Sequence, residues 1–260
     1  MNYDLVTPFP IYQIVEYIAF MSQNDYAFQT VNSHVAALSY YNKINGFIDN
    51  TQTFLVKQLL KGLNKSQKRK DNRMPITIAL LAKILPNLSH ICSSYYEATL
   101  FRVAYSISFC ALLRVSEIAS SNNGDVNHVI AFQNVKIYPT HVDIFIHKSK
   151  TDQLGKGANI KIPFTANNEF FKVALDSYLA IRPQFGGTFL CHFDGSPVTV
   201  YQFNSVLKKV LELSGIQNKR YKSHSFRIGG ASLLFLEGKS EEEIKSLGRW
   251  KSNAYKSYIR

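Results

Sequence analysis

The chain has 260 residues, 46% of them hydrophobic, so it is long and apolar enough for one large domain or two modest ones with a packed core. Thirty lysines and arginines against eighteen acidic residues give a net charge of +12, which favours an acidic partner, and nucleic acid is the commonest such partner. Three widely separated cysteines exclude a disulfide framework and a convincing metal site, and the longest apolar run is too short for a membrane span.

Residues 10–63 have the pattern of a small helical domain. Apolar side chains recur at helical spacing from Ile11 to Ile18 and again from Val31 to Tyr41. A third helix is expected around Leu55 to Leu60, with Thr53 in the capping position. These features predict a helical bundle and do not by themselves indicate its purpose.

Residues 61–73 are the clearest domain boundary. Residues 1–60 hold two lysines and four acids, a net of −2, so the remaining 200 residues carry +14. The boundary segment KGLNKSQKRKDNR has six basic residues, one acid and almost no apolar side chain, which is typical of a solvated linker. In a chain this basic, it also favours contact with nucleic-acid phosphates. The candidate phosphate contacts in this linker are Lys65, Lys68, Arg69 and Lys70.

Two helices are expected between Met74 and Leu113. The first should close at Pro86, because proline lacks the N–H that a helix interior needs. Ser94 and Glu97 have the spacing of a capping box, which predicts that the second helix opens there and runs towards Leu113.

A charged pair, Arg114 and Glu117, interrupts the apolar stretch that follows. No other charged residue occurs between Val103 and Ser121. A charge in such surroundings is costly unless it is paired or used. On local sequence alone, a buried ion pair and a functional arginine are equally compatible with this pattern.

Alternating apolar and polar residues predict a small antiparallel sheet in the next part of the chain, interrupted by a polar loop at residues 149–157. Two amphipathic helices follow it. The expected strands are residues 134–138, 142–147 and 159–163, and the expected helices are residues 168–181 and 199–213. The sequence therefore predicts a mainly α protein with a small antiparallel β-sheet.

The segment from His224 to Arg260 carries polar groups at positions that a packed core would not favour. His224 and Arg227 are three residues apart, so on a helix they share one face. An imidazole, a guanidinium, an indole N–H and a phenol together suit binding an anionic oxygen and attacking the atom beside it. The later members of this set are Trp250, Tyr255 and Tyr258.

Four motifs, LLRVSEI at 112–118, HSFR at 224–227, GRW at 248–250 and YIR at 258–260, together resemble the signature of the tyrosine recombinase (phage-integrase-like) family. The resemblance to the family rests on the order and spacing of these motifs. Within the family, members carried by eukaryotic mobile elements look most similar. The resemblance implies an N-terminal helical core-binding domain that clasps DNA, residues 1–73, and an α+β catalytic domain, residues 74–260.

The resemblance also implies roles for individual residues. The implied catalytic set is Arg114, Lys150, His224, Arg227, Trp250 and Tyr258, with Glu117 holding the centre in place. Lys150 is chosen as the hairpin lysine of the family, and Lys148 and Lys156 are its rivals. Further phosphate contacts are expected from Lys219, Arg220 and Lys222, directly before the HSFR motif.

The choice of nucleophile rests on sequence context. Tyr258 follows Trp250 by eight residues, one fewer than is common in the family, but it stands in the YIR motif. Tyr255 is therefore expected to pack, and Tyr258 to attack. The chain stops two residues later, whereas many relatives have a further C-terminal helix that docks into a neighbouring protomer, so the sequence is compatible with a fragment.

The implied activity is cleavage and rejoining of double-stranded DNA through a 3′-phosphotyrosyl link, with no metal or nucleotide cofactor, in a homotetramer on paired sites. A type IB topoisomerase shares this chemistry but acts as a monomer, and the compact helical domain favours the recombinase. The alternative is a catalytically retired DNA-binding protein, against which the complete set of residue types argues. With no signal peptide apparent, we expect an intracellular protein located where DNA is: the nucleus in a eukaryote, the cytoplasm or nucleoid in a prokaryote.

Overall fold

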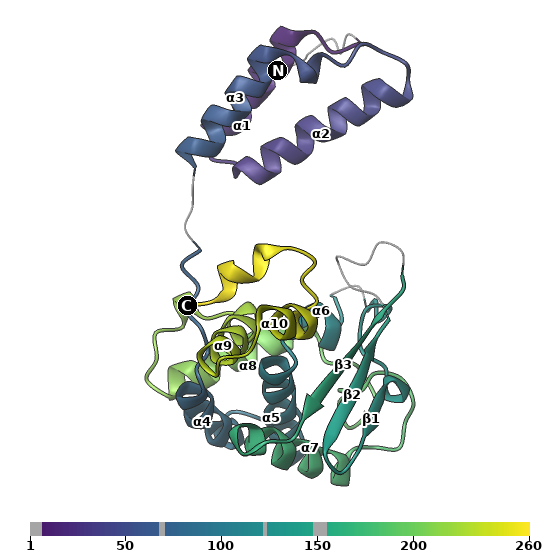
Figure 1. Ribbon diagram of the computed structural model, residues 1–260, viewed down its shortest axis with the longest axis vertical. Coiled ribbons are helices and arrows are strands. Elements are labelled where there is room, and N and C mark those ends of the chain that lie inside the picture. Colours follow the sequence, from purple (N-terminus) through teal and green to yellow (C-terminus); the bar gives the residue numbers. More distant parts are fainter. Residues whose placement is uncertain (1–6, 68–70, 122–123, 148–154) are drawn as a thin grey trace. The chain divides into compact units, whose positions relative to one another are not determined.

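The computed structural model describes residues 7–67, 71–121, 124–147 and 155–260 (Figure 1). The chain divides into two compact units, Met1–Asp71 and Asn72–Arg260, and each has its own hydrophobic core. The fold class is as predicted: mainly helical, with one three-stranded antiparallel sheet in the described residues. Within those residues, no helix is both long and apolar enough to cross a lipid bilayer.

Three α-helices build the first unit within its described residues. They are α1 Ile11–Gln23, α2 Phe28–Ile44 and α3 Phe54–Ser66, with a 3-10 turn at Asn50–Gln52 before α3. One side chain from α3 and several from α1 and α2 interlock because their apolar positions recur every three or four residues. The fully buried members of this core are Ile14, Ile18, Met21, Val31, Val35 and Val56.

The third helix is longer than expected and includes part of the basic segment that we assigned to the linker. Lysine is a good helix former, and α3 continues through Lys65 to Ser66. Gln67 then accepts a hydrogen bond from the backbone N–H of Phe28 at 2.8 Å, which ties this end to the start of α2. Lys65 is exposed there, and the other proposed linker contacts, Lys68, Arg69 and Lys70, lie outside the described residues.

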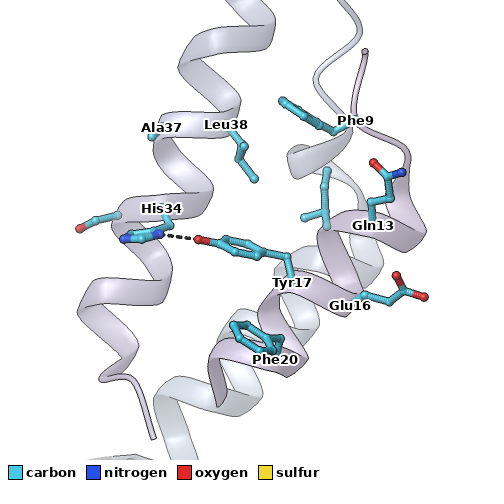
Figure 2. A pocket seen from close by; sticks show the side chains of 10 residues that line it. Phe9, Gln13, Glu16, Tyr17, Phe20, His34, Ala37 and Leu38 are labelled. Atoms are coloured by element: carbon cyan, nitrogen blue, oxygen red, sulfur yellow. Dashed lines mark hydrogen bonds between the residues drawn. The ribbon is translucent and has the colours of Figure 1, made fainter. Parts of the chain in front are cut away.

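A concavity of about 720 Å³ lies between α1 and α2 (Figure 2). Its lining is mostly apolar and includes Phe9, Phe20 and Leu38. The hydroxyl of Tyr17 lies 2.6 Å from Nδ1 of His34, which joins the two helices across it. This bundle therefore leaves an apolar face between its first two helices uncovered by its own side chains.

The second unit is organised around one buried helix, α5 Tyr95–Cys110. Twelve of its sixteen residues are buried, and it packs against both α7 and α9. The other α-helices of this unit in the described residues are α4 Ile78–Asn87, α6 Val115–Ile118, α7 Glu169–Ile181, α8 Val200–Leu213, α9 His224–Leu236 and α10 Glu241–Gly248. The chain ends in a 3-10 helix, Asn253–Tyr258.

Two helix ends differ by one to three residues from the expected positions. Pro86 does not close α4 but lies inside its last turn, where the missing N–H removes one hydrogen bond of a turn that is ending. The central helix α5 stops at Cys110, short of Leu113, because Leu112 adopts a positive φ of 48° that a right-handed helix cannot contain. Arg114 therefore lies outside α5, as the N-cap residue of α6.

The sheet follows the expected hairpin order β1-β2-β3, with antiparallel neighbours. Its strands are β1 Val135–Ile137, β2 His141–Ile146 and β3 Ala158–Pro163. In β2 the residues Val142, Ile144 and Ile146 are buried and their neighbours are partly exposed, as the alternating pattern predicts. One face of the sheet thus joins the core, and the connection from β2 to β3 includes residues outside the described part of the chain.

Candidate active site

Arg227 is the most deeply buried charge of the proposed catalytic set. Its side chain is fully buried, and it donates to the backbone carbonyls of Leu112 and Gly248. Two glycines after it let α9 approach its neighbours closely: a side chain at Gly229 would collide with the backbone of Ile76. The close approach seats the guanidinium where the end of α5 and the end of α10 meet.

Glu117 serves two arginines rather than one. Its side chain is 2% exposed, and its Oε1 lies 3.1 Å from Nη1 of Arg114, so the ion pair considered from the sequence is present. Its Oε2 accepts from the backbone N–H of Arg114 at 2.8 Å and from Nη2 of Arg249 at 2.7 Å. The carboxylate therefore joins α6 to the end of α10.

Arg249 is the middle residue of the GRW motif, but it is absent from the set of site residues that we predicted. Its side chain is 6% exposed, and besides Glu117 it donates to the carbonyls of Leu247 at 3.0 Å and Leu112 at 3.3 Å. The available signal was the GRW motif itself, which places an arginine directly before Trp250.

Three rings meet over the buried guanidinium. The ring of Tyr258 lies 4.9 Å, centroid to centroid, from that of His224 and 4.9 Å from that of Trp250. The guanidinium carbon of Arg227 lies 4.2 Å from the Trp250 ring centroid and 5.4 Å from that of Tyr258, within cation–π distance. These four members of the proposed catalytic set come from α9 and the C-terminal segment, and Arg114, near enough to lower the pKa of Arg227, is a fifth.

The other candidate tyrosine, Tyr255, is buried against α10, and its ring centroid lies 6.4 Å from that of Trp250. It is 2% exposed, and burial together with a hydrogen bond to Glu241 raises its pKa to about 12. Lys245 and Lys256 lie 5.1 and 5.9 Å from its ring centroid. Tyr255 therefore packs the C-terminal segment onto α10, and the partly exposed Tyr258 is the tyrosine that faces the arginines.

The Tyr258 segment is held by its own unit. The hydroxyl of Ser232 lies 3.1 Å from the Tyr258 carbonyl and accepts from the backbone N–H of Arg260 at 2.9 Å. The Arg260 guanidinium donates to the carbonyl of Arg73 at 2.8 Å, where the second unit begins. The single proton of the Ser232 hydroxyl has a second acceptor, the carbonyl of Ile228 at 2.9 Å, so the firmest contact of Ser232 with this segment is the hydrogen bond that it accepts from Arg260.

The electrostatics of this cluster favour an anion. Three guanidiniums, those of Arg114, Arg227 and Arg249, surround the one carboxylate of Glu117. Burial, and then the neighbouring Arg114 and Arg249, lower the pKa of Arg227 to about 9, which still leaves it charged at neutral pH. The buried Nε atoms of Arg227 and Arg249 have no hydrogen-bond partner among the described residues. A phosphate would offset this excess charge with charge-assisted hydrogen bonds.

The remaining predicted residues fall into two groups. Lys150 and its rival Lys148 lie outside the described residues, and Lys156 is exposed just before β3. The other group forms a basic edge of exposed side chains directly before α9: Lys219, Arg220 and Lys222. Arg220 donates from Nε to the carbonyl of Asn72 at 3.1 Å, so this edge borders the start of the second unit.

No protein-family model matches the sequence, and no curated protein matches it. Solved structures do. A XerH site-specific recombinase bound to a palindromic difH substrate is 14% identical, with a TM-score of 0.68 over 99% of this chain and 70% of that one. A lambda integrase dimer bound to a COC′ core site is 16% identical, with a TM-score of 0.69 over 100% of this chain and 83% of that one.

A third match is the integrase of the Tn1549 transposon in complex with circular intermediate DNA, which is 15% identical, with a TM-score of 0.61 over 96% of this chain and 80% of that one. At such identities the likeness concerns the fold. It extends over both units, so the core-binding and the catalytic parts of those proteins each have a counterpart here. The chain has the fold of the tyrosine recombinases and integrases.

Proposed function

We propose that this protein is a tyrosine-type site-specific recombinase or integrase that cuts and rejoins double-stranded DNA. The observation that carries the proposal is the position of Tyr258, with its ring 4.9 Å from His224 and beside the buried guanidinium of Arg227. The shared fold with solved recombinases supports it. The likeness to members carried by eukaryotic mobile elements rests on the GRW motif alone.

The proposed reaction exchanges one phosphate ester for another. His224 takes the phenolic proton of Tyr258, and the phenolic oxygen bonds to the phosphorus. The bond from phosphorus to the 5′ oxygen breaks, its electron pair stays on that oxygen, and a proton from Lys150 completes the 5′ hydroxyl. The products are a 3′-phosphotyrosyl link and a free 5′ hydroxyl, and the reverse sequence with another strand rejoins the DNA.

Two guanidiniums give this reaction its electrostatic support. Arg114 and Arg227 bind the non-bridging oxygens, whose negative charge grows as the tyrosine attacks, and a charged fork in a water-poor site binds it strongly. Trp250 covers Arg227 and keeps water from the phosphorus. Removing one such donor from an oxyanion site costs about 100- to 1,000-fold in rate.

The proposed DNA contacts extend beyond the reacting phosphate. The basic edge of Lys219, Arg220 and Lys222 contacts the DNA backbone near the cleaved bond, and the basic residues Lys65, Lys68, Arg69 and Lys70 supply further phosphate contacts. The first unit clasps the duplex as a core-binding domain. Four protomers on paired sites exchange strands, and the protein acts inside the cell, wherever its target DNA is.

Covalent trapping tests the proposal on DNA of any sequence. The protein is incubated in EDTA with end-labelled duplexes of randomised sequence that carry a nick, so that a cleaved fragment diffuses away. We expect an adduct that survives denaturant, that peptide mass spectrometry maps to Tyr258, and that is lost in Tyr258→Phe but kept in Tyr255→Phe.

The other outcomes are equally informative. Loss in Tyr255→Phe alone would keep the enzyme and move the nucleophile. Relaxation of supercoiled plasmid by a monomer would indicate a topoisomerase. Absence of any adduct on DNA that the protein binds would overturn the enzymatic proposal in favour of a retired DNA-binding protein.

A further inference from the structure

Arg249 occupies a backbone position that normally selects glycine. It ends α10 with a φ of +56°, in the left-handed region, where non-glycine residues are uncommon. The glycine of this turn, Gly248, stands one residue earlier, where a side chain would collide with the indole of Trp250. An arginine in the strained position indicates that its side chain is needed there.

The side chain of Arg249 is linked to each of the two proposed phosphate-binding arginines by one shared hydrogen-bond acceptor. Through the carboxylate of Glu117, at 2.7 Å, it reaches Arg114. Through the carbonyl of Leu112, at 3.3 Å, it reaches Arg227, whose guanidinium donates to the same oxygen. With a side chain 6% exposed, it is placed to act on its neighbours rather than on DNA.

Charge balance explains what such a contact does. The carboxylate of Glu117 alone would neutralise Arg114 and draw its guanidinium inwards. Because Arg249 also pairs with the Glu117 carboxylate, that carboxylate offsets the charge of Arg249, and a net positive charge remains on Arg114 and Arg227. A phosphodiester carries the charge that such a site lacks.

We propose that Arg249 is a positioning residue, which offsets the charge of Glu117 and orients Arg114 and Arg227 towards the phosphate. The inference rests on the proposed function, because the phosphate is that of the DNA substrate. It assigns a third buried arginine to the site and separates its role from that of Trp250, which follows it in the chain and stacks on the guanidinium of Arg227.

The first test measures cleavage by Arg249→Gly and Arg249→Lys on the nicked duplex recovered by covalent trapping. Glycine suits the positive φ, so Arg249→Gly removes the side chain without straining the turn. We expect its cleavage rate on bound DNA to fall about 100-fold with little change in DNA affinity, and Arg249→Lys to recover part of the rate. If Arg249→Gly does not fold, Arg249→Lys carries the test alone, with a smaller expected loss.

A substrate change separates positioning from general destabilisation. Replacing the cleaved phosphate with a neutral methylphosphonate removes the charge that Arg114 and Arg227 bind. The loss of rate caused by Arg249→Gly should then be smaller, because the orientation of Arg114 and Arg227 matters less when the substrate carries no negative charge at this position. The same defect on both substrates would contradict the proposal.

Arg182 offers a matched control. It too is buried, at 6% exposure, but its partners are backbone carbonyls outside the cluster, at Pro183, Phe185, Thr188 and Phe189. Arg182→Lys should lower thermal stability yet cleave both substrates at the wild-type rate at temperatures where it is folded. If Arg182→Lys slowed cleavage as much as Arg249→Lys does, replacing any buried arginine would have the same effect. That result would contradict a specific role for Arg249.

A second arm needs no DNA. Inorganic sulfate is titrated into the free protein at constant ionic strength while the unfolding temperature is followed. We expect a saturable rise for the wild type and for Arg182→Lys, and about tenfold weaker sulfate binding for Arg249→Gly, the effect of losing one charge-assisted contact. If the wild type forms no DNA adduct, the proposed function fails, and the sulfate titration alone decides whether Arg249 shapes an anion site. Sulfate binding that is unchanged in Arg249→Gly would overturn the proposed role of Arg249.

Discussion

Two residues in strained backbone conformations lie at the two ends of one hydrogen bond in the candidate site. Leu112 has a φ of +48° and Arg249 a φ of +56°, and Nη2 of Arg249 donates to the Leu112 carbonyl at 3.3 Å. Such conformations cost free energy and persist only where surrounding contacts fix them. Here the contacts that fix them are the arginine cluster itself, so the strain and the site depend on each other.

Ser232 is the residue on which the position of Tyr258 most directly depends. Its hydroxyl lies within hydrogen-bond distance of the Tyr258 carbonyl and of the Arg260 N–H. We expect Ser232→Ala to lower the free energy of unfolding by about 1 kcal/mol, the net value of a hydrogen bond. We also expect it to slow adduct formation about tenfold, because a loosely held nucleophile reaches the attacking geometry less often. Single-turnover cleavage of the nicked duplex measures the rate.

Ser257 is the control for Ser232. It stands beside Tyr258 and is exposed, and its hydroxyl donates to the carbonyl of Ala254 within the same short helix. Ser257→Ala should cleave at nearly the wild-type rate. Equal defects in the two variants would show that any change near the C-terminal segment slows the reaction, and the anchoring role would be withdrawn.

At the scale of elements, the site depends on how closely α9 approaches the segment before α4. The N–H of Ile76 donates to the carbonyl of Ser225 at 3.0 Å, and Gly229 packs directly on the Ile76 backbone. Backbone held by its own hydrogen bond cannot move aside for a new side chain. The same helix carries His224 and Arg227, so its seating fixes both groups together.

We therefore expect Gly229→Ala to destabilise the second unit by about 3 kcal/mol or more, as overpacking of a close contact does. Trp250 is the single tryptophan of the chain, so urea unfolding followed by its fluorescence reports on this unit. Gly62→Ala in α3, where nothing lies within 4 Å of the added carbon, is the matched control and should not lower that midpoint. A Gly229→Ala protein as stable as the wild type would contradict the close packing.

The elements themselves were largely predictable from local sequence. The strand pattern around β2, the N-cap at Ser94 and the order of the helices follow from side chains close in sequence, and the structure agrees with them. The expected capping box at Ser94 is only half formed: the Ser94 hydroxyl accepts from the Glu97 N–H, while the Glu97 carboxylate pairs with His192. The ends of α4 and α5 differ from expectation in opposite directions, since α4 continues one residue past Pro86 and α5 stops three residues before Leu113. Local pattern indicates where a helix forms, but tertiary contacts decide in which turn it ends.

The residues of the site were more predictable than their contacts: Arg249 lies in the GRW motif, but its ion pair with Glu117 was not predicted. Arg114 and Glu117 attracted attention as charges in an apolar stretch, whereas Arg249 did not, because its partner Glu117 lies 132 positions away in the sequence. No periodicity encodes a contact at that separation. The role of Lys150 stays a prediction, since that residue lies outside the described part of the chain.

At the scale of the whole molecule, charge is divided unevenly between the two units. The first unit, Met1–Asp71, has seven basic and five acidic residues, a net charge of +2, and it contains the apolar concavity between α1 and α2; the second unit holds the remaining +10 of the total of +12. The arginine cluster and the basic edge belong to the second unit. We therefore expect the second unit to supply most of the electrostatic free energy of DNA binding, and the first to contribute mainly through shape and polar contacts.

The salt dependence of DNA binding tests this division. Each phosphate that a lysine neutralises adds about 0.9 to the slope of log affinity against log salt, because a counterion is released from the duplex. Lys222→Ala, on the basic edge, should therefore reduce the slope by about 0.9, measured between about 50 and 200 mM NaCl on duplex DNA. Lys172→Ala is the control, because Lys172 is paired with Asp176 at 2.9 Å on α7 and should leave the slope unchanged. If both lysines changed the slope equally, binding would follow net charge alone, and the basic edge would have no special place on the DNA.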